Sequence, residues 1–198
     1  MFLKKNIFKQ CVSFALIAII LGYSSLITVS AAVYSVSVTR VKQKDTEWCW
    51  AACAEMVAHT VYPNSFRNQI DAVDWVHTAV VNKGANISQT AAATAYVGHS
   101  KFTAGGSSSP LSLDTVKTKL SQGKPIIASV QTGIGSRHMF VLYLYREATA
   151  NSSDSVALID PWENNTVFEY NYAPLINGGV YMSTWGNNCK WVASVDVS

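Results

Sequence analysis

The stretch QKDTEWCWAA, residues 43–52, places a glutamine six residues before a cysteine. Cys49 lies near the start of the segment Trp48 to Tyr62, which is rich in Ala and Met, lacks Gly and Pro, and stops at Pro63; this pattern predicts a helix of about four turns. A thiol at a helix N-terminus faces unpaired backbone N–H groups and the positive end of the helix dipole, which favour the nucleophilic thiolate. Gln43 carries an amide donor that, with the backbone N–H of Cys49, would form an oxyanion hole.

A nucleophilic cysteine requires a base, and the sequence offers four histidines. His59 lies ten residues further along the same helix, about 15 Å away; His77 lies in another predicted helix, and His99 in a Gly/Ser region. His138 differs because it follows a glycine-containing loop and opens a strongly apolar strand. Asp160 ends the next apolar strand, where it could orient the imidazole if the two strands are adjacent and antiparallel, although an Asp before Pro also commonly opens a turn.

The chain divides into a helical first half and a strand-rich second half. Further helices are expected at Arg67–Val81, Ser88–Val97 and Leu111–Leu120, and strands at Pro125–Gln131, His138–Arg146, Val156–Ile159, Thr166–Tyr172 and Trp191–Val197. Segments 104–110 and 171–179 are interpreted as loops that would set substrate specificity. The pattern predicts an α+β fold in which a small helical half packs on an antiparallel sheet or half-barrel, with the active site in the cleft between them.

The N-terminal segment has the organisation of a secretory signal peptide. Residues 1–10 carry three lysines and no acid, residues 11–20 are almost wholly apolar, and residues 27–33 alternate small side chains. We expect cleavage after Ala31 or Ala32, giving a leader over residues 1–32, a folded domain over residues 33–198 and a secreted, extracytoplasmic protein. An uncleaved membrane anchor is the alternative.

Composition and charge exclude several classes of protein. With 198 residues, 49% of them hydrophobic, and only 11 Gly and 5 Pro, the chain is neither disordered nor collagen-like. Three of its 15 basic residues lie in the leader, which leaves 12 basic and 12 acidic side chains in the folded domain. This balance provides no electrostatic reason to bind nucleic acid, and we expect no stable membrane association after leader cleavage.

The cysteines suggest one crosslink. Cys11 leaves with the leader, so the folded domain holds Cys49, Cys53 and Cys189. An odd number of cysteines outside the cell indicates one free thiol. We expect a disulfide between Cys53 and Cys189 that ties the C-terminal strand to the central helix. A bond between Cys49 and Cys53, acting as a redox lock, is the alternative.

In these motifs the chain resembles the papain-like cysteine peptidases. Gln, five residues and then Cys-Trp-Ala, at residues 43–51, matches the segment around their catalytic cysteine, and their histidine also heads an apolar strand. Among bacterial branches the chain is similar to the bacteriocin-processing-peptidase-like group and to plant-pathogen effector proteases, with Trp-Cys-Trp-Ala at 48–51 and Asp-Pro at 160–161. The resemblance includes the helix-to-strand junction at 120–127 and covers most of residues 41–172. An acid stands where papain has asparagine.

The resemblance implies a papain-like fold and hydrolysis of peptide bonds in a protein or peptide substrate. The catalytic residues would be Cys49, His138, Asp160 and Gln43, and the substrate-binding residues Trp50 and Trp162. No metal or organic cofactor would be required. We expect a monomer, with an inhibitor protein as one means of controlling its activity.

Two other functions fit the same sequence. One is an acyl-transfer enzyme on the same scaffold, such as a transglutaminase-like ligase or a deamidase. The other is a non-enzymatic secreted binding domain, in which the 6 Trp, 9 Tyr and 7 Phe side chains hold a ligand and Cys49 is structural. A sulfur-to-imidazole distance within about 4 Å between Cys49 and His138 would favour an enzyme.

Overall fold

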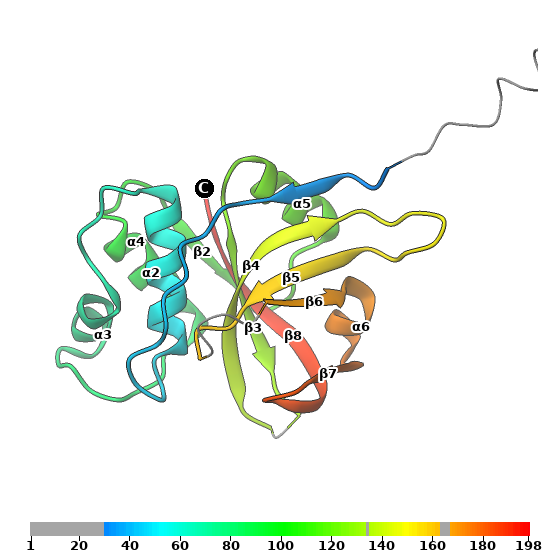
Figure 1. Cartoon of the computed structure of the whole chain (residues 1–198). Coiled ribbons are helices and arrows are strands. Elements are labelled where there is room, and N and C mark those ends of the chain that lie inside the picture. The colour runs from blue at the N-terminus through cyan, green and yellow to red at the C-terminus, as the bar shows by residue number, and fades with distance from the viewer. Residues whose placement is uncertain (1–29, 134, 163–166) are drawn as a thin grey trace, which may run out of the picture. The chain divides into compact units, whose positions relative to one another are not determined.

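The helical half predicted from the first part of the sequence is present as three packed helices (Figure 1). In the computed structural model, which describes residues 30–133, 135–162 and 167–198, these helices are α2 (Cys49–Val61), α3 (Gln69–His77) and α4 (Ile87–Val97). Asn68 and Asn86 begin α3 and α4 with capping boxes, in which each side-chain oxygen accepts from a backbone N–H of the first turn. The second helix is shorter than the predicted segment 67–81, because it begins after Asn68 and stops where Thr78 turns to a left-handed φ of 54°.

The second half forms an antiparallel sheet in the order β2-β8-β3-β4-β5-β6, with β1 beside β4 and β7 beside β8. The strands are β1 (Val33–Ser35), β2 (Ala104–Ser107), β3 (Ile126–Gln131), β4 (Arg137–Arg146), β5 (Ser155–Ile159), β6 (Val167–Asn171), β7 (Val180–Met182) and β8 (Gly186–Val197). All five predicted strands are present, and β8 starts at Gly186 rather than Trp191. The predicted α+β, papain-like fold class is confirmed.

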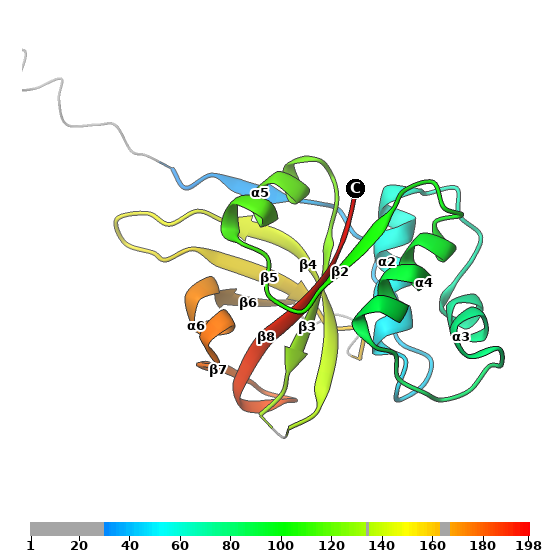
Figure 2. The ribbon, with the colours of Figure 1, turned by 180° about the vertical axis from the view of Figure 1, so that it is seen from behind.

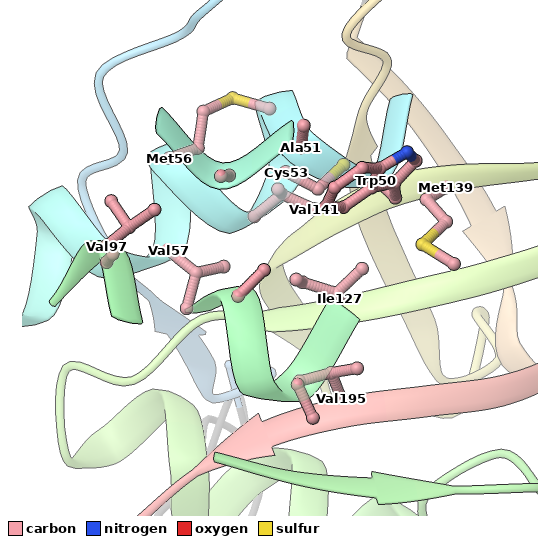
Figure 3. Packing of buried hydrophobic residues seen from close by; sticks show 14 of the residues in the cluster. Trp50, Ala51, Cys53, Met56, Val57, Val97, Ile127, Met139, Val141 and Val195 are labelled. Atoms are coloured by element: carbon pink, nitrogen blue, oxygen red, sulfur yellow. The ribbon is translucent and has the colours of Figure 1, made fainter. Parts of the chain in front are cut away.

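The sheet separates two hydrophobic cores, because successive side chains of a strand point to opposite faces. Ile127 and Val141 pack with α2 and α4 on one face, as Figure 3 shows. Ile126 and Leu142 pack on the other face, which α5 (Leu113–Ser121) and α6 (Tyr172–Asn177) cover (Figure 2). The helical half therefore packs against one face of the sheet, and α5 and α6 cover the other.

Two segments interpreted as loops contain regular structure. Ala104–Ser107 is the edge strand β2, paired with the end of β8, and Tyr172–Asn177 is helix α6. The sequence Gly105-Gly106 led to the loop interpretation. A Cβ on Gly106 would lie 2.7 Å from a side-chain carbon of Ile87, so glycine there allows the strand to approach α4 closely.

The expected disulfide between Cys53 and Cys189 is not formed, and all three described cysteines are free. Cys53 lies in the core on the helix side, whereas Cys189 lies in the core on the opposite face. The sheet between them prevents the approach of about 7 Å or less between Cα atoms that a disulfide requires. The Cys189 thiol instead contacts the carbonyl of Gly186 at 3.3 Å.

The predicted leader, residues 1–32, lies outside the described residues except for its last three positions. The carbonyl of Ala32 accepts a hydrogen bond from the backbone N–H of Glu147 at 2.9 Å, immediately before β1 joins β4. Within the described part of the chain, no helix has the length and apolar character needed to cross a membrane.

Candidate active site

Cys49 is the first residue of α2, and its side chain is partly exposed. The first hydrogen bond of the helix joins the N–H of Ala52 to the carbonyl of Trp48 at 3.0 Å, so the N–H groups of the residues before Ala52 have no acceptor within the helix. The first turn, which is fully described, contains no acidic residue. Backbone donors and the positive end of the helix dipole therefore lie beside the sulfur without a compensating carboxylate from that turn.

His138 lies near the start of β4 and is only 4% exposed. Val141 of β4 pairs with Ile159 of β5, and Asp160 follows Ile159 directly, so strand pairing brings Asp160 to His138. The imidazole Nε2 lies 2.6 Å from Oδ1 of Asp160, and the ring also interacts with the side chain of Cys49. Burial lowers the pKa of His138, but the hydrogen bonds and charges of Asp160 and Cys49 outweigh this effect and raise it to about 9.

Among the described residues, three donors hold the Asp160 carboxylate, whose side chain is 0% exposed. Oδ1 accepts from His138 and from the backbone N–H of Trp162 at 2.8 Å, while Oδ2 accepts from the indole N–H of Trp185 at 2.9 Å. The Trp185 ring also stacks on the imidazole, with centroids 4.1 Å apart and planes at 23°, and the Phe140 ring meets the imidazole edge-on at 4.8 Å. Sequence reasoning missed Trp185 because it comes from the turn between β7 and β8, 25 residues after Asp160.

Gln43 lies near the loop that follows β5, but its amide group is engaged within its own segment. Its backbone N–H donates to the carbonyl of Pro161 at 2.8 Å, and its side chain is 5% exposed. Nε2 donates to the carbonyls of Asp45 and Thr46 at 2.7 and 3.0 Å; because carbonyls only accept, these contacts settle the orientation of the amide. Donation to an oxyanion would require one of these bonds to be exchanged, and the longer one, to Thr46, is the natural candidate.

A fully buried glutamine holds the backbone on both sides of Gln43. Nε2 of Gln69, the first residue of α3, donates to the carbonyl of Lys42 at 3.0 Å and to Oε2 of Glu55 at 3.3 Å. Its Oε1 accepts from the N–H of Lys44 at 2.8 Å. Glu55 of α2 also accepts from the backbone N–H of Gln69 at 2.9 Å. Polar side chains from α2 and α3 thus fix the segment that carries Gln43.

The family model for the peptidase C39-like family matches residues 35–187. The chain belongs to the peptidase C39-like family. Among solved structures it is similar to the crystal structure of UfSP from C. elegans, with a TM-score of 0.52 and 8% sequence identity over 89% of this chain and 35% of that one. This likeness concerns the fold, and the chain spans about a third of the length of the UfSP chain. No curated protein matches the sequence. Family and fold together support a papain-like cysteine peptidase.

The two tryptophans expected to bind substrate differ in exposure in this C39-like chain. Trp50 is 1% exposed, and its indole N–H donates to the carbonyl of Lys83 at 3.1 Å, so it packs beneath the site and presents almost no surface to a substrate. Trp50 nevertheless lines the same hollow as Cys49, and its role in substrate binding stays a prediction. Trp162 is 38% exposed and lines a hollow together with Gln43. A second hollow is lined by Glu47, Cys49, Trp50, Gly84, Ala85, Asn86, Ile87, Ser129, Arg137 and Met139.

The other three histidines are engaged elsewhere. His59 bonds a backbone carbonyl at 2.7 Å, the ring of His77 lies edge-on to an indole with centroids 5.8 Å apart, and His99 packs against two aromatic rings. The site therefore combines a partly exposed thiol at a helix start, an imidazole that interacts with it, and a buried carboxylate 2.6 Å from that ring.

Proposed function

We propose that this chain hydrolyses peptide bonds with Cys49 as nucleophile, His138 as the acid–base group and Asp160 as the group that orients the ring. One observation carries the proposal: a buried imidazole lies 2.6 Å from a buried carboxylate and interacts with the Cys49 thiol, and its pKa is raised to about 9. Such an imidazole accepts the thiol proton at neutral pH, and the resulting imidazolium stabilises the thiolate beside it.

The reaction follows from this charge distribution. The Cys49 thiolate attacks the carbonyl carbon of the substrate, a C–S bond forms, and the carbonyl electron pair moves to oxygen. The backbone N–H of Cys49 lies where it can donate to that oxygen, and Gln43 would add a second donor after exchanging its bond to Thr46. The intermediate then collapses, the C–N bond breaks, and the leaving amine takes the proton from His138.

Hydrolysis of the thioester completes the cycle. Water attacks the acyl carbon and transfers a proton to His138, the C–S bond breaks, and the acid product leaves while the Cys49 thiolate and the imidazolium return. Asp160 contacts Nε2 and so orients the ring, which leaves Nδ1 available for the proton exchange with Cys49. We further propose that a protein or peptide is the substrate and that the domain acts outside the cytoplasm, as the N-terminal leader pattern suggests.

Alkylation tests the proposal, because the chain contains its own control thiols. Cys49 is partly exposed, while Cys53 and Cys189 are buried, and burial raises the pKa of both buried thiols. We expect iodoacetamide to modify Cys49 rapidly near pH 6, to spare the other two cysteines in the folded protein, and to abolish cleavage of a peptide library. Peptide mapping by mass spectrometry identifies the modified residue.

The Cys49→Ala variant should lose both the rapid modification and the cleavage. If Cys49 reacts no faster than a cysteine in a short peptide, or if the variant still cleaves, the proposal is wrong and the binding-domain hypothesis is favoured. Mass analysis of the products in the presence of an added amine separates hydrolysis, which leaves a free carboxylate, from acyl transfer, which leaves a new amide.

A further inference from the structure

Trp185 is held in a fixed position between the two segments that carry the acid–base pair. Its backbone N–H donates to the carbonyl of Met182 at 2.9 Å, which closes the turn from β7 to β8. Its carbonyl accepts from the N–H of Gly133 at 3.0 Å, in the turn that leads into β4 and His138. Trp185 is therefore attached by its backbone to the segment before His138, and by its indole N–H to Asp160.

Hydrogen-bond donors offset the cost of burying the Asp160 carboxylate. It is fully buried, and a buried carboxylate is costly unless hydrogen bonds satisfy its oxygens. Within the described part of the chain, Oδ1 accepts from His138 and from the backbone N–H of Trp162, and Oδ2 accepts from the indole N–H of Trp185. With both oxygens occupied, the carboxylate cannot rotate away from the imidazole without breaking a charge-assisted hydrogen bond.

The indole face also covers the imidazole. The two rings are nearly parallel at 4.1 Å between centroids, a geometry in which the electron-rich face of an indole attracts a cation. The imidazolium form of His138 gains from this contact more than the neutral form does. Because the indole covers one face of the imidazole, it also limits access of water to the hydrogen bond between His138 and Asp160.

We propose that Trp185 is a positioning residue for the catalytic pair, which stabilises the protonated ring of His138 with its indole face and fixes the Asp160 carboxylate with its N–H. This inference rests on the proposed function, since it assigns Trp185 a role in the same site. Among the described residues, the titratable groups that act on His138 are Asp160, directly after β5, and Cys49 at the start of α2. Trp185 acts on the ring without being titratable itself.

The test measures the titration of His138 directly, by NMR of the labelled imidazole, in the full chain and in Trp185 variants. Trp185→Leu removes both the indole face and the N–H, and should lower the pH at which His138 loses its proton by about 0.5–1 pH unit. Trp185→Phe keeps an aromatic face and should restore most of that difference. Trp75→Leu is the matched control, because Trp75 also stacks on an aromatic ring, that of Tyr96 at 4.9 Å, but lies outside the site; it should leave the titration unchanged.

The alkylation rate of Cys49 against pH provides the second readout, and its alkaline limit should move with the His138 titration. Trp185→Met, which keeps apolar bulk without a ring face, replaces Trp185→Leu if the leucine variant does not fold, as judged by circular dichroism. A His138 titration that is the same in the wild type and in a folded non-aromatic variant overturns the inference. The NMR result does not depend on cleavage, so Trp185 can still be tested if Cys49 proves unreactive and the proposed function fails.

Discussion

Replacing Gln69 by Leu tests whether a buried side chain far from the sulfur supports the site. Gln69 is fully buried and bonds the backbone on both sides of Gln43 as well as the carboxylate of Glu55. Leucine has a similar size but neither donates nor accepts hydrogen bonds. The substitution leaves the carbonyl of Lys42, the N–H of Lys44 and one oxygen of Glu55 each short of one hydrogen bond.

The expected loss of stability follows from these three groups. A buried polar group without a partner costs about 1–3 kcal/mol, and the low end applies to the segment around Gln43 because water can reach its exposed neighbours. The free energy of unfolding should therefore fall by about 3 kcal/mol. Gln89→Leu is the control, because Gln89 accepts only one bond, from the N–H of Asn86 at 3.0 Å in an exposed capping box; its loss should be about 0.5–1 kcal/mol.

Urea unfolding at pH 7 measures both losses, and peptide cleavage reports on the site. Cleavage should fall roughly tenfold in Gln69→Leu, because a mobile segment no longer holds Gln43 near the oxyanion. Alkylation of Cys49, which forms no oxyanion, should be unchanged. Equal losses of stability for Gln69→Leu and Gln89→Leu would refute the assignment of Gln69 as a buried clamp.

Two further predictions use other parts of the fold. Asp160→Asn removes a charge that raises the pKa of His138, so the alkaline limit of cleavage should move down by about 2 pH units; the rate at pH 8 then falls about tenfold while the rate at pH 6 changes little, and an unmoved alkaline limit in the pH profile of kcat/KM contradicts this. Gly133→Ala places a Cβ 1.8 Å from the carbonyl oxygen of Asn187, whereas the nearest atom to a Cβ on Gly105 lies 3.7 Å away. Urea unfolding should show a loss of about 3 kcal/mol for Gly133→Ala and almost none for Gly105→Ala, and similar losses would mean that the backbone adjusts freely.

Local patterns predicted the frame of the site. The Ala-rich run after Cys49 and the apolar runs around His138 and before Asp160 are each decided by neighbouring residues, and the structure places the expected helix and strands there. The resemblance to papain-like peptidases added the fold, which is confirmed. The catalytic roles of these residues stay predictions, which the structure supports by bringing the three side chains together.

The errors share a physical cause. The disulfide between Cys53 and Cys189 was expected from their number and compartment, but α2 carries Cys53 into the core on one face of the sheet, whereas Cys189 of β8 lies in the core on the other face. Residues 104–110 were interpreted as a loop, but Ala104–Ser107 pairs with the end of β8 as an edge strand. In both cases the residue types alone did not reveal the outcome, because the packing of distant segments decided it.

The sequence by itself determined most of the helices and strands, though not all of their ends, and which residue types could act as nucleophile, acid–base group and orienting acid, because periodicity and capping depend on adjacent residues. Only the tertiary structure decided that Trp185 covers His138, that Gln69 holds the segment of Gln43, and that the amide of Gln43 is already engaged. The contacts of Trp185 and Gln69 join segments far apart in the chain. Those of the Gln43 amide are local, but several nearby groups could have been its partners. Sheet order, strand register and the packing of the whole domain set them together, and no local pattern encodes that outcome.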